Sequence, residues 1–156
     1  MTALPTADLA RFDDVLRREG VAAGLGTLNA RVPHRYTAVY RLEGSKLKNL
    51  FLHDKDGQAR PEYLAEVDLG VSFCQFVLRD GCFLTDNSSS DRRLDGHPYQ
   101  GLMVSYHGVP LLDNAGQLFG SLCHFDIEER GLSNDEFDFL QQAARVLPGY
   151  VVTRST

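Results

Sequence analysis

The sequence predicts an α+β domain in which a central antiparallel sheet carries the N- and C-terminal helices on one face. Apolar residues repeat every three to four positions over residues 7–31 and again over 133–147, as in amphipathic helices. Between them lie two pairs of strand-like runs, each pair joined by a short turn. Strands joined by hairpins form antiparallel sheets, and helices typically cover one face of such a sheet.

Length and charge exclude several classes of protein. The 156 residues suffice for one domain with a substantial core. The formal net charge is −5 and no basic run stands out, so we expect no nucleic-acid partner. No segment approaches the roughly 20 apolar residues of a membrane span, and the N-terminus lacks the pattern of a secretory signal. We therefore expect a cytoplasmic location, and from the odd number of three cysteines we expect reduced thiols rather than disulfides.

The first half of the chain reads as a helical region followed by a hairpin. The helical period of residues 7–31 is weakened by Gly20, Gly24 and Gly26, which predicts a break near the middle of the region. Residues 36–44 and 46–54 then read as two strands. The sequence Glu43-Gly44-Ser45 between them predicts a tight turn.

The middle of the chain is less regular. Residues 72–81 fit either a short helix ending at Gly81 or a strand, and residues 82–86 look like a short strand. Residues 88–98 are polar and loop-like, with room for one helical turn capped by a serine.

The last third contains the clearest strand pair and a capped helix. Residues 102–111 and 117–126 flank a short loop with Asn and Gly for the turn. Ser133 and Glu136 form a capping-box pattern, in which Ser133 caps the helix and Glu136 reaches back. One helical face follows, made of Phe137, Leu140, Ala143, Ala144 and Leu147, until Pro148-Gly149 ends or kinks the helix.

Cys123 and His124 stand side by side in the stretch GQLFGSLCHFD and raise the question of a reactive pair. Side chains alternate faces along a strand, so the two residues point to opposite sides of the sheet and cannot act on one substrate or one metal. The same alternation groups Cys123 with Phe119, Ser121 and Phe125. We therefore expect Cys123 to pack in the core as a small apolar residue.

The last third resembles the C-terminal half of a GAF domain. The family shows a strand ending in Tyr-x-Gly-Val-Pro-Leu, an acidic-Gly turn, a strand of the form Gly-x-Leu-Cys-x-x-Asp, and a helix opened by Leu-Ser. The matching residues are Tyr106, Gly108, Val109, Pro110, Leu111, Gly116, Gly120, Leu122, Cys123, Asp126, Leu132 and Ser133. The resemblance covers residues 7–147 of one domain that spans 1–156. It suggests that Gly108 and Gly120 permit close packing.

The resemblance implies a small-molecule pocket on the face of the sheet opposite the terminal helices, enclosed by loops and short helices. The candidate ligand-binding residues are Cys74, Phe76, Cys82, Phe83, Thr85, Asp86, Asp91, Arg92, Tyr99, Met103, Tyr106 and His107. Arg92 or Arg93 would clamp a carboxylate or phosphate, and Phe83, Tyr99 and Tyr106 would supply apolar or stacking walls. No particular cofactor is indicated.

Bilin attachment, metal binding and reduction of free methionine sulfoxide each require particular residues. The segment HPYQGLMVSY lacks the cysteine that would attach a bilin. Asp91, Asp95, His97 and His107 contain metal-ligating groups but fit a solvated polar loop better. The branch of the family that reduces free methionine sulfoxide uses pocket cysteines. Cys74 and Cys82 match that role by placement, although their flanking residues do not.

We therefore expect a stand-alone sensory domain that binds a small molecule or a protein partner in signalling, rather than an enzyme. The apolar stripes of the terminal helices offer a surface for a homodimer, unless the sheet uses them fully. Two alternatives stay open: a thiol-dependent reductase of the free methionine sulfoxide type, and a degenerate domain that serves as an interaction scaffold without a ligand.

Overall fold

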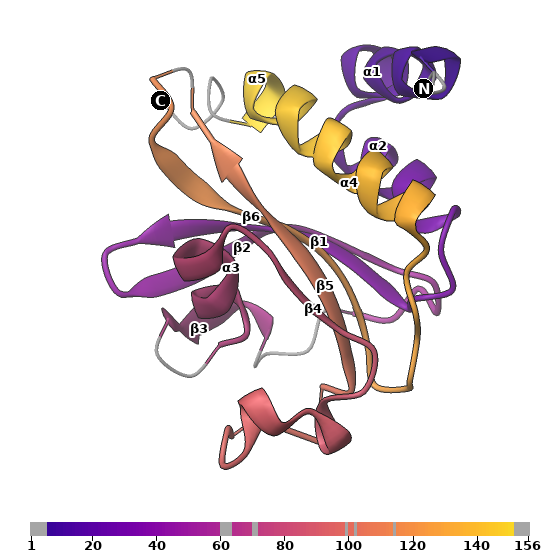
Figure 1. The fold of residues 1–156 in the computed structure, drawn as a ribbon. Helices are drawn as coiled ribbons and strands as arrows, with labels where there is room; N and C mark the ends of the chain where they lie inside the picture. Colours follow the sequence, from indigo (N-terminus) through magenta and orange to yellow (C-terminus); the bar gives the residue numbers. More distant parts are fainter. Residues whose placement is uncertain are drawn as a thin grey trace.

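The computed structural model describes residues 6–59, 64–69, 72–98, 100–101, 103–113 and 115–151, apart from the side chains of Thr6 and Leu78 (Figure 1). The helices are α1 (Thr6–Glu19), α2 (Val21–Asn29), α3 (Cys74–Asp80), α4 (Asn134–Val146) and α5 (Pro148–Val151), with 3₁₀ turns at Ser88–Ser90 and Arg92–Leu94. The strands are β1 (Tyr36–Glu43), β2 (Lys46–Asp54), β3 (Glu66–Asp68), β4 (Phe83–Thr85), β5 (Ser105–Leu112) and β6 (Leu118–Asp126). Among these residues, no helix has the length and apolar character needed to cross a bilayer.

The strands form one antiparallel sheet in the order β3-β2-β1-β6-β5-β4. The two predicted hairpins are β1–β2 and β5–β6. They meet at the centre of the sheet, where β1 pairs with β6. Helices α1, α2, α4 and α5 lie on one side of the sheet, whereas α3 lies on the other (Figure 1). The predicted α+β architecture is therefore confirmed.

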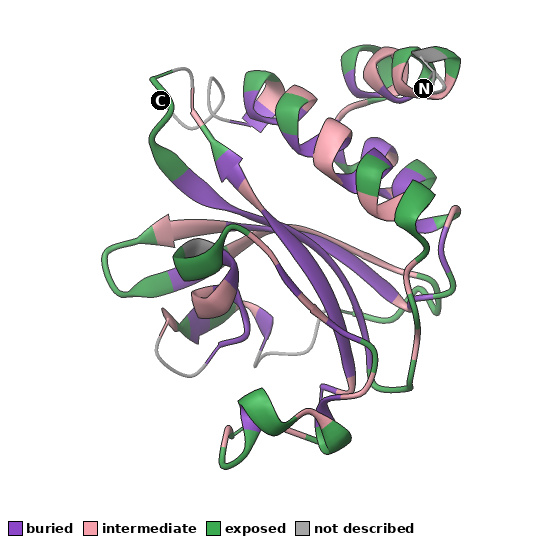
Figure 2. Cartoon of the chain, viewed as in Figure 1, coloured by how far each residue is buried: buried purple, intermediate pink, exposed green. Residues whose placement is uncertain are grey.

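The sheet separates two apolar cores, because side chains alternate between its faces. The helix-side core contains Val39, Val109 and Leu122 from the sheet. It also contains Leu25 and Leu140 from the helices. The cavity-side core is built on Tyr36, Ala38, Tyr40, Tyr106, Cys123 and Phe125, and α3 covers it with Cys74 and Val77. In Figure 2 the central strands are buried, while green exposed positions mark the outer sides of the helices.

Cys123 and His124 lie on opposite faces, as predicted, and both are almost fully buried. The grouping of Phe119 with Cys123 was wrong, because Phe119 belongs to the helix-side core. A register shift between β5 and β6 pairs Leu111 with Gly120 but Leu112 with Leu118. This bulge leaves Phe119 outside the pairing and reverses its face relative to simple alternation.

Several predicted helix ends are confirmed, with two corrections. Gly20 has φ of 100° and separates α1 from α2, and Gly81 ends α3 with φ of 88°, so residues 72–81 hold a helix rather than a strand. Ser133 caps α4 by accepting from the Glu136 N–H. The Glu136 carboxylate does not reach back, because it forms a bidentate pair with Arg31.

The second correction concerns the loop of residues 88–98. It holds two 3₁₀ turns, and their caps are Asn87 and Asp91 rather than a serine. Each side-chain oxygen accepts from the backbone N–H two residues further on. This is the local bond that Asn and Asp form readily in turns.

Candidate functional site: an apolar cavity under helix α3

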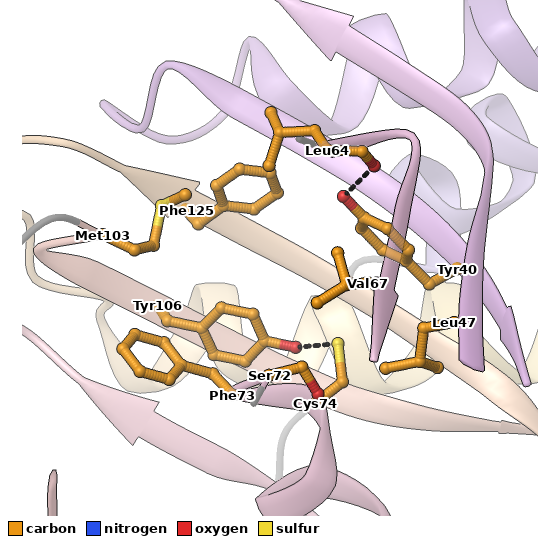
Figure 3. Close-up of a pocket in the computed structure, with 10 residues that line it drawn as sticks. All are labelled: Tyr40, Leu47, Leu64, Val67, Ser72, Phe73, Cys74, Met103, Tyr106 and Phe125. Atoms are coloured by element: carbon orange, nitrogen blue, oxygen red, sulfur yellow. Dashed lines mark hydrogen bonds between the residues drawn. The ribbon is translucent and has the colours of Figure 1, made fainter. Parts of the chain in front are cut away.

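A cavity of about 50 Å³ lies between the sheet and the segment that leads into α3 (Figure 3). Its walls come from β1, β2, β3, β5, β6 and residues 72–74. The lining residues are Tyr40, Leu47, Leu64, Val67, Ser72, Phe73, Cys74, Met103, Tyr106 and Phe125. Alternation places the strand residues of this set on the same face of the sheet, which is why an apolar chamber forms there.

The polar groups at the cavity are already bonded to protein atoms. The Tyr40 hydroxyl donates to the Leu64 carbonyl at 2.9 Å, and the Ser72 hydroxyl donates to the Leu69 carbonyl at 2.9 Å. The Tyr106 hydroxyl lies 3.0 Å from the Cys74 sulfur. The described residues that line the cavity include no Asp, Glu, Lys, Arg or His. The chamber therefore suits a neutral, apolar occupant, because a charge left unpaired there would lose its hydration.

Cys74 is the chemically distinctive residue of the cavity. It opens α3, and its Sγ also lies 3.2 Å from the Ser121 hydroxyl. The neighbouring Cys123 thiol, followed by Ser121 and Tyr106, lowers the pKa of Cys74 by hydrogen bonding, although burial opposes the shift. Burial raises the pKa of Cys123 well above its ordinary value. Cys74 is therefore the more acidic thiol of this buried pair.

The structure brings three of the predicted site residues, Cys74, Met103 and Tyr106, to the cavity. Phe76 and Phe83 lie beside it in an aromatic cluster, with ring centroids 4.8 Å apart. Cys82 is half-buried and packs against the helix-side core, so it does not join Cys74 in the cavity. Tyr99 lies outside the described residues.

A second subset of the predicted site residues lines a separate open groove of about 500 Å³. This subset consists of Thr85, Asp86, Asp91 and Arg92. Within the groove Arg93 donates to Asp91 at 2.9 Å and lowers the pKa of that carboxyl to about 2. The Arg93 guanidinium also lies over the Phe83 ring, 4.6 Å from its centroid. The groove is thus polar, exposed and internally paired, unlike the cavity.

His107 lies on the helix side of the sheet, away from the cavity, and its Nε2 lies 2.8 Å from Asp86 Oδ1 at the edge of the groove. Its neighbour Tyr106 points into the cavity, so strand alternation turns His107 to the other face. The described residues hold no group of three or more His, Cys, Asp or Glu side chains that could bind a metal ion. The loop residues Asp91 and Asp95 with His97 and His107 are therefore not assembled as a metal site.

Sequence reasoning missed most of the cavity wall. The lining residues that it did not name are Tyr40, Leu47, Leu64, Val67, Ser72, Phe73 and Phe125. Part of the signal was present, because Phe125 had been placed on the face of Cys123, and Tyr36, Ala38 and Tyr40 alternate along β1. Leu64 and Val67 carried no such signal, since their position depends on a three-residue strand.

No family model matches the sequence, and no curated protein matches it either. The chain is similar to the solved GAF domain of an Acinetobacter phosphoenolpyruvate-protein phosphotransferase, with 14% identity, coverage of 99% of this chain and 97% of that chain, and a TM-score of 0.77. It is also similar to a free methionine-R-sulfoxide reductase from Neisseria meningitidis, with 16% identity, coverage of 100% and 97%, and a TM-score of 0.72. The chain is similar as well to the phycocyanobilin-bound GAF domain of a cyanobacterial phytochrome. The sequence identity is 12%, the match covers 98% of this chain and 96% of that chain, and the TM-score is 0.71.

Proposed function

Because the chain has the fold of GAF domains, we propose that it is a sensory domain that binds a small, neutral and apolar molecule in the cavity under α3. The observation that carries this proposal is the apolar lining of the cavity, which is built from both hairpins and from the start of α3 (Figure 3). Similar domains hold small molecules, as the phycocyanobilin-bound structure does. Fold alone does not choose the ligand, so the lining must do so.

The size of the cavity limits the ligand. Pockets for drug-sized molecules measure roughly 300–1,000 Å³, and an engineered apolar cavity of about 150 Å³ admits benzene. The chamber of about 50 Å³ is smaller than either. A ligand of one ring or more therefore enters only if the segment leading into α3 shifts outward.

We expect neutral aromatic molecules to stabilise the protein, and their charged counterparts to have no effect. Toluene, phenol or indole at about ten times Kd would raise Tm by about 3–6 °C, whereas benzoate at the same concentration would not. A thermal-shift series measures this difference. A shift by benzoate without one by toluene would contradict the apolar site.

The matched control fills the cavity without adding charge. Val67 lines the chamber from β3, so Val67→Phe would occupy the space and abolish the shift by neutral ligands. The extra volume is expected to cost about 1–3 kcal/mol if the wall does not relax. Retention of the full ligand shift in folded Val67→Phe protein would move the binding site elsewhere.

Thiol-dependent reduction of free methionine sulfoxide is a second candidate function, and the position of Cys74 favours it. A Cys74 thiolate would attack the sulfoxide sulfur and, with the uptake of one proton, take its oxygen, which releases methionine and leaves a sulfenic acid. A second thiol would condense with that acid to a disulfide with loss of water, and an external dithiol would restore both cysteines. The contact between Cys74 and Cys123 makes Cys123 the nearer second thiol, ahead of Cys82.

Serine substitutions separate this activity from ligand sensing. If the protein is a reductase, Cys74→Ser is expected to lose more than about a hundredfold in activity with methionine sulfoxide and dithiothreitol, because serine is a far poorer nucleophile. Cys82→Ser is the matched control and would retain activity. Absence of activity in the unsubstituted protein, measured as methionine released, would eliminate the reductase.

A sensory domain needs a route to its output, and we propose contact with a second copy or with a signalling partner in the cytoplasm. The apolar stripes of α1 and α4 do not serve as a free surface, since Phe12, Leu16 and Leu140 are buried in the helix-side core. The exposed large apolar residues among those described are Leu112, Leu118 and Ile127. Leu112 and Leu118 flank the β5–β6 turn and would support a contact there.

Sedimentation equilibrium tests the dimer directly. We expect a mass of two chains at high protein concentration, and Leu112→Ser is expected to shift the equilibrium toward the 17.4 kDa monomer. If the protein is a monomer across the whole concentration range, the homodimer proposal is wrong, and contact with a different partner protein is the proposal that stays. The same preparation can be screened with the neutral ligands named above. If none of them binds, the result favours an interaction scaffold over a ligand sensor.

A further inference from the structure

Three histidines are buried together on the helix side of the sheet, and none of them lines the cavity or the groove. His34 comes from the connection between α2 and β1, His107 from β5 and His124 from β6. Their exposed fractions are 0%, 2% and 2%. His107 and His124 are direct partners in the β5–β6 register, and the His34 ring centroid lies 5.0 Å from that of His107 and 5.5 Å from that of His124.

An exposed carboxylate sets the direction of the hydrogen bonds through two of these rings. His107 Nε2–H donates to Asp86 Oδ1 at 2.8 Å, so the neutral His107 ring has an unprotonated Nδ1. That Nδ1 accepts from His34 Nε2–H at 2.9 Å. The His34 ring is then unprotonated at Nδ1. This atom is buried and has no hydrogen-bond partner among the described residues. His34 Nδ1 is therefore a buried nitrogen that is able to accept a proton.

The third histidine is tied to the same segment of chain by a second series of bonds. Asn29 at the end of α2 donates to the Thr37 hydroxyl at 2.9 Å and to the His34 carbonyl at 3.0 Å. The Thr37 hydroxyl in turn donates to His124 Nδ1 at 2.6 Å. Lys55 donates to Asn29 Oδ1 at 2.6 Å and to the Val32 carbonyl at 2.9 Å. These bonds hold residues 30–35 against the centre of the sheet.

The surroundings keep all three rings neutral. Burial, and then the nearby His107, lower the pKa of His34 to about 3, and burial also lowers the pKa values of His107 and His124. The charged groups that face the cluster are Asp86, Asp126, Lys55 and Arg130, while Arg35 beside it is paired with Asp54. Asp86 and Asp126 favour protonation, but Lys55, Arg130 and the rings themselves oppose it.

We propose that His34, His107 and His124 form a proton-operated latch, which holds residues 30–35 against the sheet while all three rings are neutral and releases them when one ring takes up a proton. His107 and His124 are held by the strand ladders of β5 and β6, whereas His34 lies on a short irregular connection. Protonation is therefore relieved by moving His34 to solvent, which separates the like charges and ends the burial of the charged ring. The ligand of this site is the proton itself.

The direction of the pH effect follows from linkage. Each ring has a lower pKa in the folded chain than the ordinary value near 6.5, so the unfolded or opened state binds more protons. The stabilising contribution is complete above pH 6.5 and is lost as the pH falls from there toward the folded pKa, about 3 for His34. Between pH 7.5 and 5.5, a histidine whose folded pKa lies as low as that of His34 raises the opening or unfolding constant about tenfold.

Hydrogen–deuterium exchange on the whole chain distinguishes a latch from general acid unfolding. After correction for the intrinsic exchange rate, amides of residues 30–35 are expected to open at least about tenfold more at pH 5.5 than at pH 7.5. Amides at the centre of β6 are expected to keep their protection. A uniform loss of protection across both segments would overturn the latch.

Conservative variants test which ring carries the effect. His34→Gln keeps a donor toward His107 but cannot titrate, so its urea-unfolding constant is expected to change about tenfold less between pH 7.5 and 5.5 than that of the unsubstituted protein. His124→Asn keeps an acceptor for Thr37 and is expected to behave likewise. His53→Gln, on β2 and outside the cluster, is the matched control and should keep the full pH dependence. Full pH dependence in His34→Gln would also overturn the proposal.

A measurement on the unsubstituted protein removes dependence on the variants' folding. NMR titration of the histidine rings is expected to show His34 unprotonated in the folded state down to pH 5.5, with the pKa values of His107 and His124 below the ordinary value near 6.5. Titration of all three rings near pH 6.5 in folded protein, with unchanged amide protection, would eliminate the proposed latch whether or not the variants fold.

Discussion

Gly120→Ala is expected to destabilise the protein by about 3 kcal/mol or more, and to leave much of it unfolded at moderate urea concentrations. A Cβ at this position would lie 1.9 Å from the backbone oxygen of Tyr40. Gly120 pairs with Arg41 on one side and with Leu111 on the other, so β6 cannot move away from β1 without disturbing β5. Because the obstacle is backbone rather than a flexible side chain, relaxation is expensive. Urea unfolding measures the loss.

A second glycine provides the control for this substitution. Gly149 in α5 has no atom within 4 Å of an added Cβ, so Gly149→Ala is expected to change stability by less than about 1 kcal/mol. If Gly120→Ala and Gly149→Ala unfold at the same urea concentration, then the close approach of β6 to β1 is not a constraint on the fold.

Leu122→Ala is expected to cost about 3–4 kcal/mol, within the range of roughly 2–5 kcal/mol for emptying a buried leucine site. Leu122 is 0% exposed and lies at the centre of the helix-side core on β6. Its neighbours come from the sheet and from the helix layer, so they cannot collapse into the void together. A loss of about 3–4 kcal/mol in the free energy of unfolding is expected to lower Tm by roughly 6–16 °C.

The same strand offers the matched control. Leu118 is 38% exposed at the start of β6, so Leu118→Ala removes the same atoms from a site that is already partly in water. Its cost is expected to stay below about 1 kcal/mol. Equal losses for Leu118→Ala and Leu122→Ala, measured by thermal unfolding, would contradict the assignment of Leu122 to the interior.

Most of the secondary structure could be predicted because its determinants are local. Apolar periodicity marks α1, α2 and α4, and the positive φ values of Gly20, Gly44 and Gly81 occur where sequence reasoning placed breaks and turns. The choice between helix and strand for residues 72–81 was not local. Those residues fit both patterns, and packing of Cys74 and Val77 on the sheet accompanies the helix.

The candidate site was less predictable than the fold. Cys74, Met103 and Tyr106 were expected in the pocket and do line the cavity, but Thr85, Asp86, Asp91 and Arg92 line a separate groove. Residues from one loop are close in sequence, and this made them look like a single site. The cavity instead collects ten side chains from six segments of the chain, which only the tertiary fold brings together.

The sequence by itself determined the hairpins, the breaks between helices, the capping by Ser133 and the opposite faces of Cys123 and His124. These follow from backbone preferences and from alternation along one strand. Tertiary structure alone decided that Cys74 meets Cys123, that Phe119 crosses to the helix side at a bulge, and that His34 joins His107. The physical reason is that such contacts depend on the pairing register and burial of distant segments, and no local preference encodes either.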